Sequence, residues 1–494
     1  MPEYLSPGVY VEEVPSAVKP IAGVSTSTAA FVGVVPDKIT MAEENPDFDP
    51  TKDSTPAGGG NSPYITWEFP YPKAECDKAE NALDGLSDQR PRRMKAGGNA
   101  AAYRKAQDNY AAASARFSVG QMADAGTPVL CTSFTDFKKN FGSFSQNGLP
   151  PLAPAAGAAG GGGGGGAPAG AGGAAAAPEG FQNQLAHAVY GFFENGGTRC
   201  YVMRYPKLAD LQDPEKWEPL EAIEDISLVA APGILDSTVL SNLIDHCEKL
   251  SSRFAILDAP ESPNEFTEKA LKVPARNSDY AAIYFPHVRI FDRTTKLLNP
   301  DGDGQISQAP SGHIAGIYSR VDHQRGVHKA PANEVVRGAL DVEHQISRSQ
   351  QDGLNPYGVN CIRFINENIT VWGARTIGGD ANTDLKYINV RRTLIFLRES
   401  IDRGTQWVVF EPNDRTLWAK IRLNITAFLT TVWRDGALFG STPQEAFFVK
   451  CDDETNPREE RDLGRVTCEI GVAIVRPAEF VIFRISQWAG PDQK

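Results

Sequence analysis

The segment ISLVAAPGILDSTVLSNLIDHCEKLSSRFAILDAP, from Ile226 to Pro260, shows the strand–helix–strand order that predicts the fold. Its two ends, ISLVAAPG (226–233) and RFAILDAP (253–260), are short apolar runs closed by proline-containing turns, so we expect two buried strands. The segment between them, TVLSNLIDHCEKLSS (238–252), is predicted to be a helix. Because strands that alternate with helices usually pair in parallel, this order predicts a mainly parallel sheet with helices on its faces.

The same alternation extends on both sides of this segment. Further strands are expected at STAAFVGVV (27–35), CYVMRY (200–205) and DYAAIYFPHVRI (279–290). Beyond Gly358 the order changes, with amphipathic helices at NVRRTLIFLRESI and RTLWAKIRLNITAFLTTVWRDGAL and strands at TQWVVFEP, AFFVKCD and RVTCEIGVAIV. The predicted fold class is therefore α/β and α+β multidomain, with a first domain built on a mixed sheet followed by an α+β C-terminal domain.

Changes in composition predict the domain boundaries. Residues 41–125 contain loop chemistry, a basic RPRRMK segment and one helix, which is typical of an insertion. A Gly/Ala/Pro tract has almost no side chains to bury, so it cannot offset its ordering entropy and is expected to be a flexible loop. We expect an N-terminal segment (1–24), a first domain (25–357) interrupted by the insertion (41–125) and the Gly/Ala loop (150–180), and a C-terminal domain (358–494) with a last strand at 479–488.

Composition and charge argue against several classes of protein. At 494 residues the chain is too long for one core, and 41% hydrophobic with 22% charged residues is ordinary for a globular protein. A net charge of −12 argues against a nucleic-acid surface. No run approaches the roughly 18 apolar residues of a membrane span, and MPEYLSPG does not resemble a signal peptide, so we expect folding in the cytosol. Seven scattered cysteines without a CxxC pair favour buried thiols.

Two stretches resemble metal-binding patterns in part. NPDGDGQI (299–306) has the spacing of the first half of a calcium loop, but the twelfth position, which needs an acidic ligand, is Pro310. His323 and His328 are five residues apart, whereas a helical metal pair needs three or four, and His313 does not complete a ligand set. We expect a surface turn, structural histidines, and neither a metal nor a cofactor.

Asp258 is the one residue that suggests catalysis. It follows a predicted parallel strand, and α/β enzymes place catalytic groups at the carboxyl ends of such strands. The chain has no GxSxG elbow and no GxGxxG after a strand, and Asp-Ala-Pro is also a common way for a strand to end. An α/β enzyme that uses Asp258 is therefore the alternative to a non-enzymatic function, which we favour.

Both ends of the chain carry short strand-forming runs. EFVIFRISQW (479–488) is apolar on both of its faces, as in a strand buried inside a sheet, and SPGVYVEEV (6–14) is a second such run. Chain ends usually fray unless something holds them. The residues expected to be held in this way, either within their own chain or by a neighbouring one, are Val9, Tyr10, Val11, Phe480, Ile482, Phe483 and Ile485.

Several stretches, in order along the chain, resemble the contractile tail sheath family of phages and phage-tail-like injection systems. The resemblance covers residues 1–35, 126–148 and 181–490. The motifs that carry it are YLSPGVYVEEVPS, LAHAVYGFFENGGTRCYVMRY, SGHIAGIYSRVDHQRGVHKAPAN, LNPYGVNCIRF, VWGARTI, NVRRTLIFLRESI, TQWVVFEPND, FLTTVWRDGALFGSTPQEAFFVKCD and PAEFVIFRISQW.

This resemblance implies a structural protein without enzymatic activity. Copies of the chain would stack as rings around an inner tube in a metastable extended state, and contraction would drive the tube through a target envelope. The terminal arms would be exchanged between subunits, the C-terminal domain would face the tube with residues such as Lys420 and Arg434, and the 41–125 insertion would lie outside.

The partners implied by the resemblance are further copies of the chain, an inner tube protein, and baseplate and terminal cap proteins, with no nucleic acid. Assembly is expected in the cytoplasm, as part of a phage tail or of a phage-tail-like particle that stays inside the cell or is released. The sequence leaves open whether the surface touches a membrane.

Overall fold

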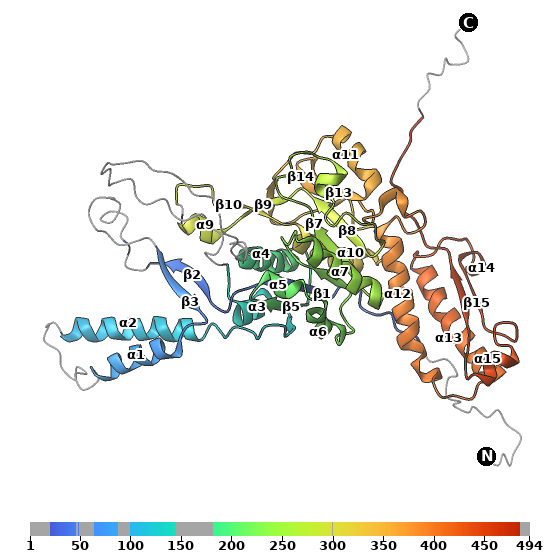
Figure 1. Cartoon of the computed structure of the whole chain (residues 1–494), viewed down its shortest axis with the longest axis horizontal. Helices are drawn as coiled ribbons and strands as arrows, with labels where there is room; N and C mark the ends of the chain where they lie inside the picture. Colours follow the sequence, from blue (N-terminus) through green and yellow to red (C-terminus); the bar gives the residue numbers. More distant parts are fainter. Residues whose placement is uncertain are drawn as a thin grey trace, which may run out of the picture. The chain divides into compact units, whose positions relative to one another are not determined.

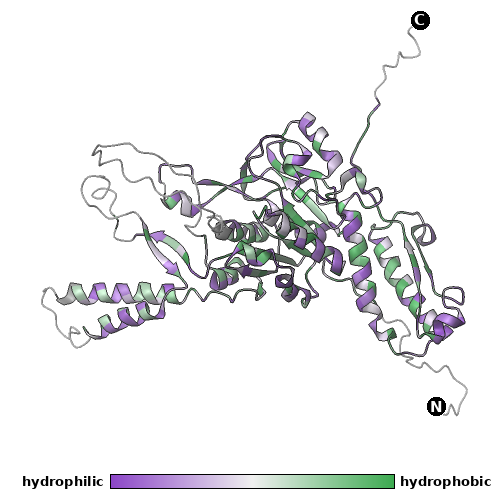
Figure 2. Cartoon of the chain, viewed as in Figure 1, coloured by the Kyte–Doolittle hydropathy of each residue, from purple (hydrophilic) through white to green (hydrophobic). Residues whose placement is uncertain are grey.

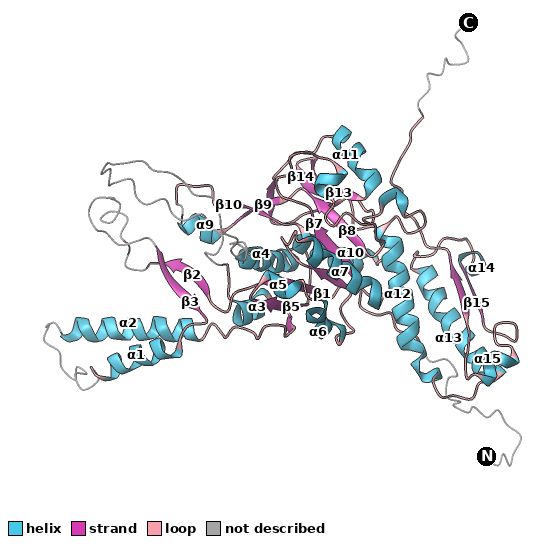
Figure 3. Cartoon of the chain, in the orientation of Figure 1, coloured by secondary structure: helices cyan, strands magenta, loops and turns pink. Residues whose placement is uncertain are grey.

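The chain folds into two compact units. The computed structural model describes residues 20–45, 48, 64–86, 99–144, 181–298 and 300–484 (Figures 1 and 3). The larger unit is Ser25–Arg392, and the smaller unit combines Met1–Val24 with Thr393–Lys494. The predictions for Val9, Tyr10, Val11 and Ile485, and for the 150–180 tract, concern residues outside the described part of the chain.

The larger unit is built on a nine-stranded sheet with the order β11-β14-β13-β8-β7-β6-β1-β5-β4. The strands from β5 to β13 in this order are parallel, and β4, β14 and β11 are antiparallel to their neighbours. The sheet is therefore mixed with a parallel centre. Its strands are β1 (Ala29–Val34), β4 (Val129–Cys131), β5 (Cys200–Tyr205), β6 (Leu228–Ala230), β7 (Phe254–Asp258), β8 (Ala281–Phe285), β11 (Glu334–Val335), β13 (Val359–Ile365) and β14 (Asn368–Trp372).

The strand–helix–strand prediction for 226–260 is confirmed. Strands β6 and β7 are buried along their whole length and pair in parallel, with α7 (Ser237–Leu250) between them in the chain. The helix begins where the Asp236 carboxylate accepts hydrogen bonds from the backbone N–H groups of Thr238 and Val239, both at 3.0 Å. Its apolar side joins the core around the central strands, which Figure 2 shows as the most hydrophobic part of this unit.

Helix α10 (Ser311–Arg325) is buried along most of its length and packs on α4 (Phe181–Glu194). Gly312 and Gly316 allow this contact, because a Cβ on Gly312 would lie 2.3 Å from the carbonyl oxygen of Ala188. On Gly316 it would lie 2.4 Å from the carbonyl oxygen of Phe192. A side chain at either position would force the two helix backbones apart.

The remaining elements of the larger unit form small sheets and short helices. A second sheet has the order β10-β9-β12, and β2 pairs with β3 in the region predicted to be an insertion, where α1 packs on α2. These elements are β2 (Ile39–Glu44), β3 (Tyr64–Phe69), α1 (Lys73–Asp84), α2 (Asn99–Phe117), α3 (Phe134–Phe141), α5 (Leu208–Leu211), η2 (Pro214–Trp217), α6 (Glu218–Glu221), α8 (Glu268–Leu271), β9 (Val288–Phe291), α9 (Arg293–Leu298), β10 (Gln305–Gln308), β12 (Ala339–Val342), α11 (Arg348–Leu354), η3 (Asn355–Tyr357) and η4 (Gly379–Ala381).

A buried ion pair holds the two points at which the chain enters and leaves the larger unit. Arg392 makes two hydrogen bonds to the carboxylate of Asp322, at 2.9 and 2.6 Å, and both side chains are less than 5% exposed. Arg392 also donates to the carbonyl of Thr26, and the Thr26 hydroxyl donates to Asp322 at 2.6 Å. The guanidinium lies over the ring of Tyr318. The two ends of this unit are thereby tied to α10.

The smaller unit is α+β. Its elements are α12 (Ile388–Thr405), whose first turn belongs to the larger unit, η5 (Gln406–Val408), α13 (Arg415–Arg434), α14 (Pro443–Ala446), β15 (Phe447–Lys450), α15 (Arg458–Asp462) and β16 (Glu469–Val472). Strands β15 and β16 pair in antiparallel fashion. One face of α13 supplies much of the core, together with Ile21 and Leu397.

The boundary between the units differs from the domain boundary predicted at 358. Strands β13 and β14 belong to the nine-stranded sheet, because Val359 to Cys361 pair with Ile283 to Phe285 of β8. The larger unit therefore extends to Arg392. The change from parallel to antiparallel order near Gly358 marks the edge of a sheet rather than the start of a new unit.

The predicted strand at TQWVVFEP (405–412) is wrong. Helix α12 reaches Thr405, η5 follows, and local turns use the backbone, with Val409 N–H donating to Gln406 and Glu411 N–H donating to Val408. Phe410 has φ 66° and a fully exposed ring. The strand-forming residues do not form a strand here because no strand of the described chain lies beside them to pair with, and their backbone groups bond in local turns instead.

Candidate functional site

The small sheet of β15 and β16 is continued beyond β16 by local pairing, in which Phe439 N–H donates to the carbonyl of Ala473 and Val475 N–H donates to the carbonyl of Ala437. Among the described residues it contains only these two strands, and a two-stranded ribbon is marginally stable by itself. Phe447 points into the core, while Phe448 is 59% exposed and lies over Gly471, the residue opposite it. A Cβ at Gly471 would lie 2.1 Å from the Phe448 ring, so glycine leaves room for that ring. A sheet with so few strands can take a strand from another chain at an edge that is not already paired.

The described part of the C-terminal arm, Glu479–Arg484, is not in a helix or strand. Four consecutive apolar residues in it are 67% to 83% exposed: Phe480, Val481, Ile482 and Phe483. Exposed apolar patches mark sites of contact with proteins, membranes or ligands. Three residues predicted to be held by a partner, Phe480, Ile482 and Phe483, thus have no cover within the described chain.

Helix α13 separates an apolar side from a polar one. It begins at the Asp414 carboxylate, which accepts a hydrogen bond from Leu417 N–H at 2.8 Å. Lys420 and Arg434, the residues predicted to face a tube, are both exposed. The opposite side is buried and consists of Leu417, Trp418, Ile421, Asn424, Ile425, Phe428, Leu429 and Val432.

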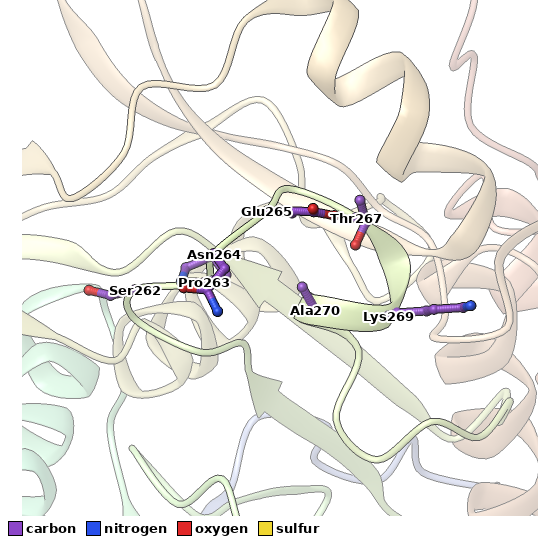
Figure 4. A pocket seen from close by; sticks show the side chains of 7 residues that line it. All are labelled: Ser262, Pro263, Asn264, Glu265, Thr267, Lys269 and Ala270. Carbon is purple, nitrogen blue, oxygen red and sulfur yellow. The ribbon is translucent and has the colours of Figure 1, made fainter.

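Asp258 has a structural role, which the sequence did not reveal. The carboxylate is buried and accepts hydrogen bonds from Gly233 N–H at 3.1 Å, Ser311 N–H at 2.8 Å and the Ser311 hydroxyl at 2.7 Å. Burial raises the pKa of Asp258, and these hydrogen bonds oppose the rise. The group joins the loop before α7 to the first turn of α10. It does not line the open, polar depression formed by Ser262, Pro263, Asn264, Glu265, Thr267, Lys269 and Ala270 (Figure 4).

The histidines singled out in the sequence are not gathered into a ligand set. His313 is buried, and this burial together with nearby His187 lowers its pKa to about 4. The ring of His323 contacts the carbonyl of Ser319, one turn earlier in α10. The described residues contain no group of three or more His, Cys, Asp or Glu side chains placed to hold a metal ion.

The loop that resembles half of a calcium site is closed by a protein cation. The Lys296 ammonium donates to the carbonyls of Pro300 and Gly302, each at 2.8 Å. Asp303 accepts a hydrogen bond from Gln305 N–H at 3.0 Å, which tightens the turn before β10. The arrangement is that of a surface turn held by its own lysine.

Comparisons with known proteins match the fold and the sequence to one family. A model of the phage tail sheath protein central domain matches residues 217–377, and a model of the phage tail sheath C-terminal domain matches residues 380–487. The chain belongs to the contractile tail sheath family.

Two curated relatives are tail sheath proteins. The one from Burkholderia phage BcepMu is 26% identical over 239 residues, which is 46% of this chain and 47% of that protein. The one from Vibrio phage KVP40 is 25% identical over 177 residues, which is 35% of this chain and 25% of that protein. The chain thus spans about half or less of these relatives' length.

Two solved structures share the fold over nearly the whole chain. The sheath complex of the extracellular contractile injection system PVC, in its contracted state, has a TM-score of 0.61 at 22% identity, covering 99% of both chains. The helical sheath of the anti-feeding prophage, also contracted, has a TM-score of 0.61 at 23% identity, covering 98% of this chain and 99% of that one. None of the described helices is long and apolar enough to cross a membrane.

Proposed function

We propose that this chain is the repeating subunit of a contractile sheath. Copies stack as rings around an inner tube, a baseplate triggers their rearrangement, and the shortening sheath pushes the tube through a target envelope. Assembly takes place in the cytoplasm. The observation that carries the proposal is the apolar C-terminal segment, exposed in the single chain, together with a sheet that contains only two strands in the described part of the chain.

The terminal arms are proposed to complete this sheet in neighbouring subunits. A strand added to a free edge gains main-chain hydrogen bonds, and its alternate side chains enter pockets of the acceptor. Phe480, Ile482 and Phe483 supply apolar surface, worth about 1.5–3 kcal/mol for each side chain that becomes fully buried. Val9, Tyr10, Val11 and Ile485 are assigned the same role. Because this energy is gained only between chains, the polymer depends on the arms and the monomer does not.

Truncation separates exchanged arms from strands that pair within their own chain. One variant lacks residues 1–16, another ends at Pro477, and a control that ends at Trp488 removes only the last six residues. Thermal unfolding and tube formation, seen by electron microscopy, are measured for each. We expect both arm variants to be folded and soluble without forming tubes, whereas the control assembles. A large fall in the melting temperature of the arm variants would contradict arm exchange.

The polar side of α13 is proposed to face the tube. Lys420 and Arg434 are exposed, and each exposed ion pair contributes only about 0–1 kcal/mol. Several such contacts hold the tube while leaving the surfaces free to separate. Charge reversal at Lys420 and Arg434 is therefore expected to loosen the sheath on its tube, more strongly at low salt. If the sheath still sedimented with the tube at all salt concentrations, the polar side of α13 would not be the surface that faces the tube.

The 41–125 region is proposed to lie on the outside of the cylinder. Helix α1 has no buried residue, which suits a solvated position. Replacing residues 45–122 by a short linker is expected to leave tube assembly intact. A soluble, folded variant that forms no tubes would contradict this position.

The energy for contraction is proposed to be stored in the assembled extended state, as a kinetic trap. Purified extended particles are therefore expected to contract after a chemical or thermal trigger in buffer that lacks nucleoside triphosphates. Contraction only after a nucleoside triphosphate is added would refute this part of the proposal.

A further inference from the structure

Cys451 and Cys468 face each other across the small sheet of the smaller unit. The last pair of the β15–β16 ladder is Lys450 with Glu469, so the next opposed residues in this register are the two cysteines. Opposed residues of an antiparallel pair have Cβ atoms about 4.5–5.5 Å apart, close to the roughly 3.5–4.5 Å that a disulfide needs. The two thiols are free, and each is close enough to influence the pKa of the other.

Neighbouring side chains hold this pair in place beyond the end of the ladder. Asn456 is buried, donates to the carbonyl of Thr467 at 3.0 Å and accepts from Thr467 N–H at 2.7 Å. Its amide also lies 3.8 Å from the sulfur of Cys451. Arg422 donates to the carbonyl of Cys451 at 2.5 Å. These bonds fix the two cysteine-bearing segments against one another, so closure requires little backbone movement.

We propose that Cys451 and Cys468 form a site of oxidative modification, which a small-molecule disulfide closes into a cross-strand disulfide bond. Cys468 is the entry point because it is partly exposed, whereas Cys451 is buried. The Cys468 thiolate attacks the small disulfide, forms a mixed disulfide and releases one thiolate. The Cys451 thiolate then attacks the Cys468 sulfur and releases the second. The protein loses two electrons and two protons, and the small disulfide is reduced to two thiols.

The reaction is slow at neutral pH and accelerates in base. Burial raises the pKa of Cys468 to about 12, and it also raises the pKa of Cys451. Only the thiolate attacks a disulfide, so below the pKa the rate rises about tenfold for each pH unit. The pair therefore stays reduced in a cytosol and closes during long exposure to an oxidising medium.

A second cysteine pair in the chain provides an internal control. Cys131 and Cys200 are opposed in the β4–β5 ladder of the larger unit, in the same antiparallel relation. Both are completely buried, so a small-molecule disulfide cannot reach either of them as it can reach Cys468. Cys76 is partly exposed and serves as a reporter of oxidant access.

Peptide mapping of the full chain tests the proposal. The protein is treated with glutathione disulfide at pH 8.5 and digested without reduction. We expect a Cys451–Cys468 linked peptide, lighter by two hydrogen atoms and split again by dithiothreitol, together with a glutathione adduct on Cys76. The Cys131 and Cys200 peptides are expected to remain free. Adducts on Cys76 with no 451–468 link, or links distributed among all cysteines, would overturn the proposal.

Serine variants report the order of the two steps. Cys451→Ser removes the second nucleophile, so a stable glutathione adduct is expected to accumulate on Cys468. Cys468→Ser removes the entry point, so Cys451 is expected to stay unmodified. An adduct on Cys451 in that variant would show that the buried thiol reacts first and would refute the assigned roles.

Discussion

Replacing Gly312 with alanine is expected to destabilise the larger unit by about 2 kcal/mol. The new Cβ would lie 2.3 Å from the carbonyl oxygen and 2.4 Å from the Cα of Ala188, far inside van der Waals contact. Both atoms belong to the backbone of α4, so the helices must separate. Overpacking of this kind costs about 1–3 kcal/mol. The higher helix propensity of alanine offsets roughly 0.5–1 kcal/mol of this loss. Because the clash is with backbone atoms, we expect the overpacking cost to lie near the upper end of its range.

Gly353→Ala is the matched control. This glycine is exposed in α11, and a Cβ there would meet nothing within 4 Å. The same substitution should therefore stabilise the chain by about 0.5–1 kcal/mol. Urea unfolding is measured for both variants, with hydrogen exchange of α4 and α10 peptides assigning the loss to the helix contact. Stability of the Gly312 variant equal to or above that of wild type would refute the close α4–α10 packing.

Further variants test buried polar groups at three places in the larger unit. Arg392→Met should lower the free energy of unfolding by about 3–5 kcal/mol, because it leaves Asp322 as an uncompensated buried charge. In a double-mutant cycle with Asp322→Leu, the double variant should lose much less stability than the two single variants lose together. The pKa of His313 is about 4 in the folded protein, depressed from 6.5, so the folded state holds this histidine neutral while the unfolded state takes up a proton below pH 6.5. The free energy of unfolding should therefore fall as the pH drops from 6.5 towards 4. In urea titrations, His313→Leu should reduce the decrease in unfolding free energy between pH 7 and pH 4 by about 3 kcal/mol. Asp258→Ala should lower stability by about 2–4 kcal/mol because its three hydrogen-bond donors lose their acceptor, and Asp258→Asn by less; an alanine variant that melts like wild type would contradict the structural role.

The sequence by itself determined most of the local elements and the class of fold. Apolar runs such as 253–258 form buried strands because their side chains have no polar face to expose to water, and 415–434 forms a helix because its apolar residues recur on one side. The apolar pattern of Phe480, Ile482 and Phe483 also predicts that these residues need cover, and they are exposed in the described chain. These features depend on neighbours along the chain, which the sequence displays directly.

The tertiary structure decided which distant segments meet. Residues 359–372 join the nine-stranded sheet through β8, and TQWVVFEP stays out of any sheet because its backbone is bonded in local turns. Asp258 stands at a strand end, as in an enzyme, yet Ser311, 53 residues away, encloses it. The opposition of Cys451 and Cys468 follows from strand register alone. Pairing, register and burial depend on contacts between residues far apart in sequence, and a local sequence pattern carries no information about such contacts.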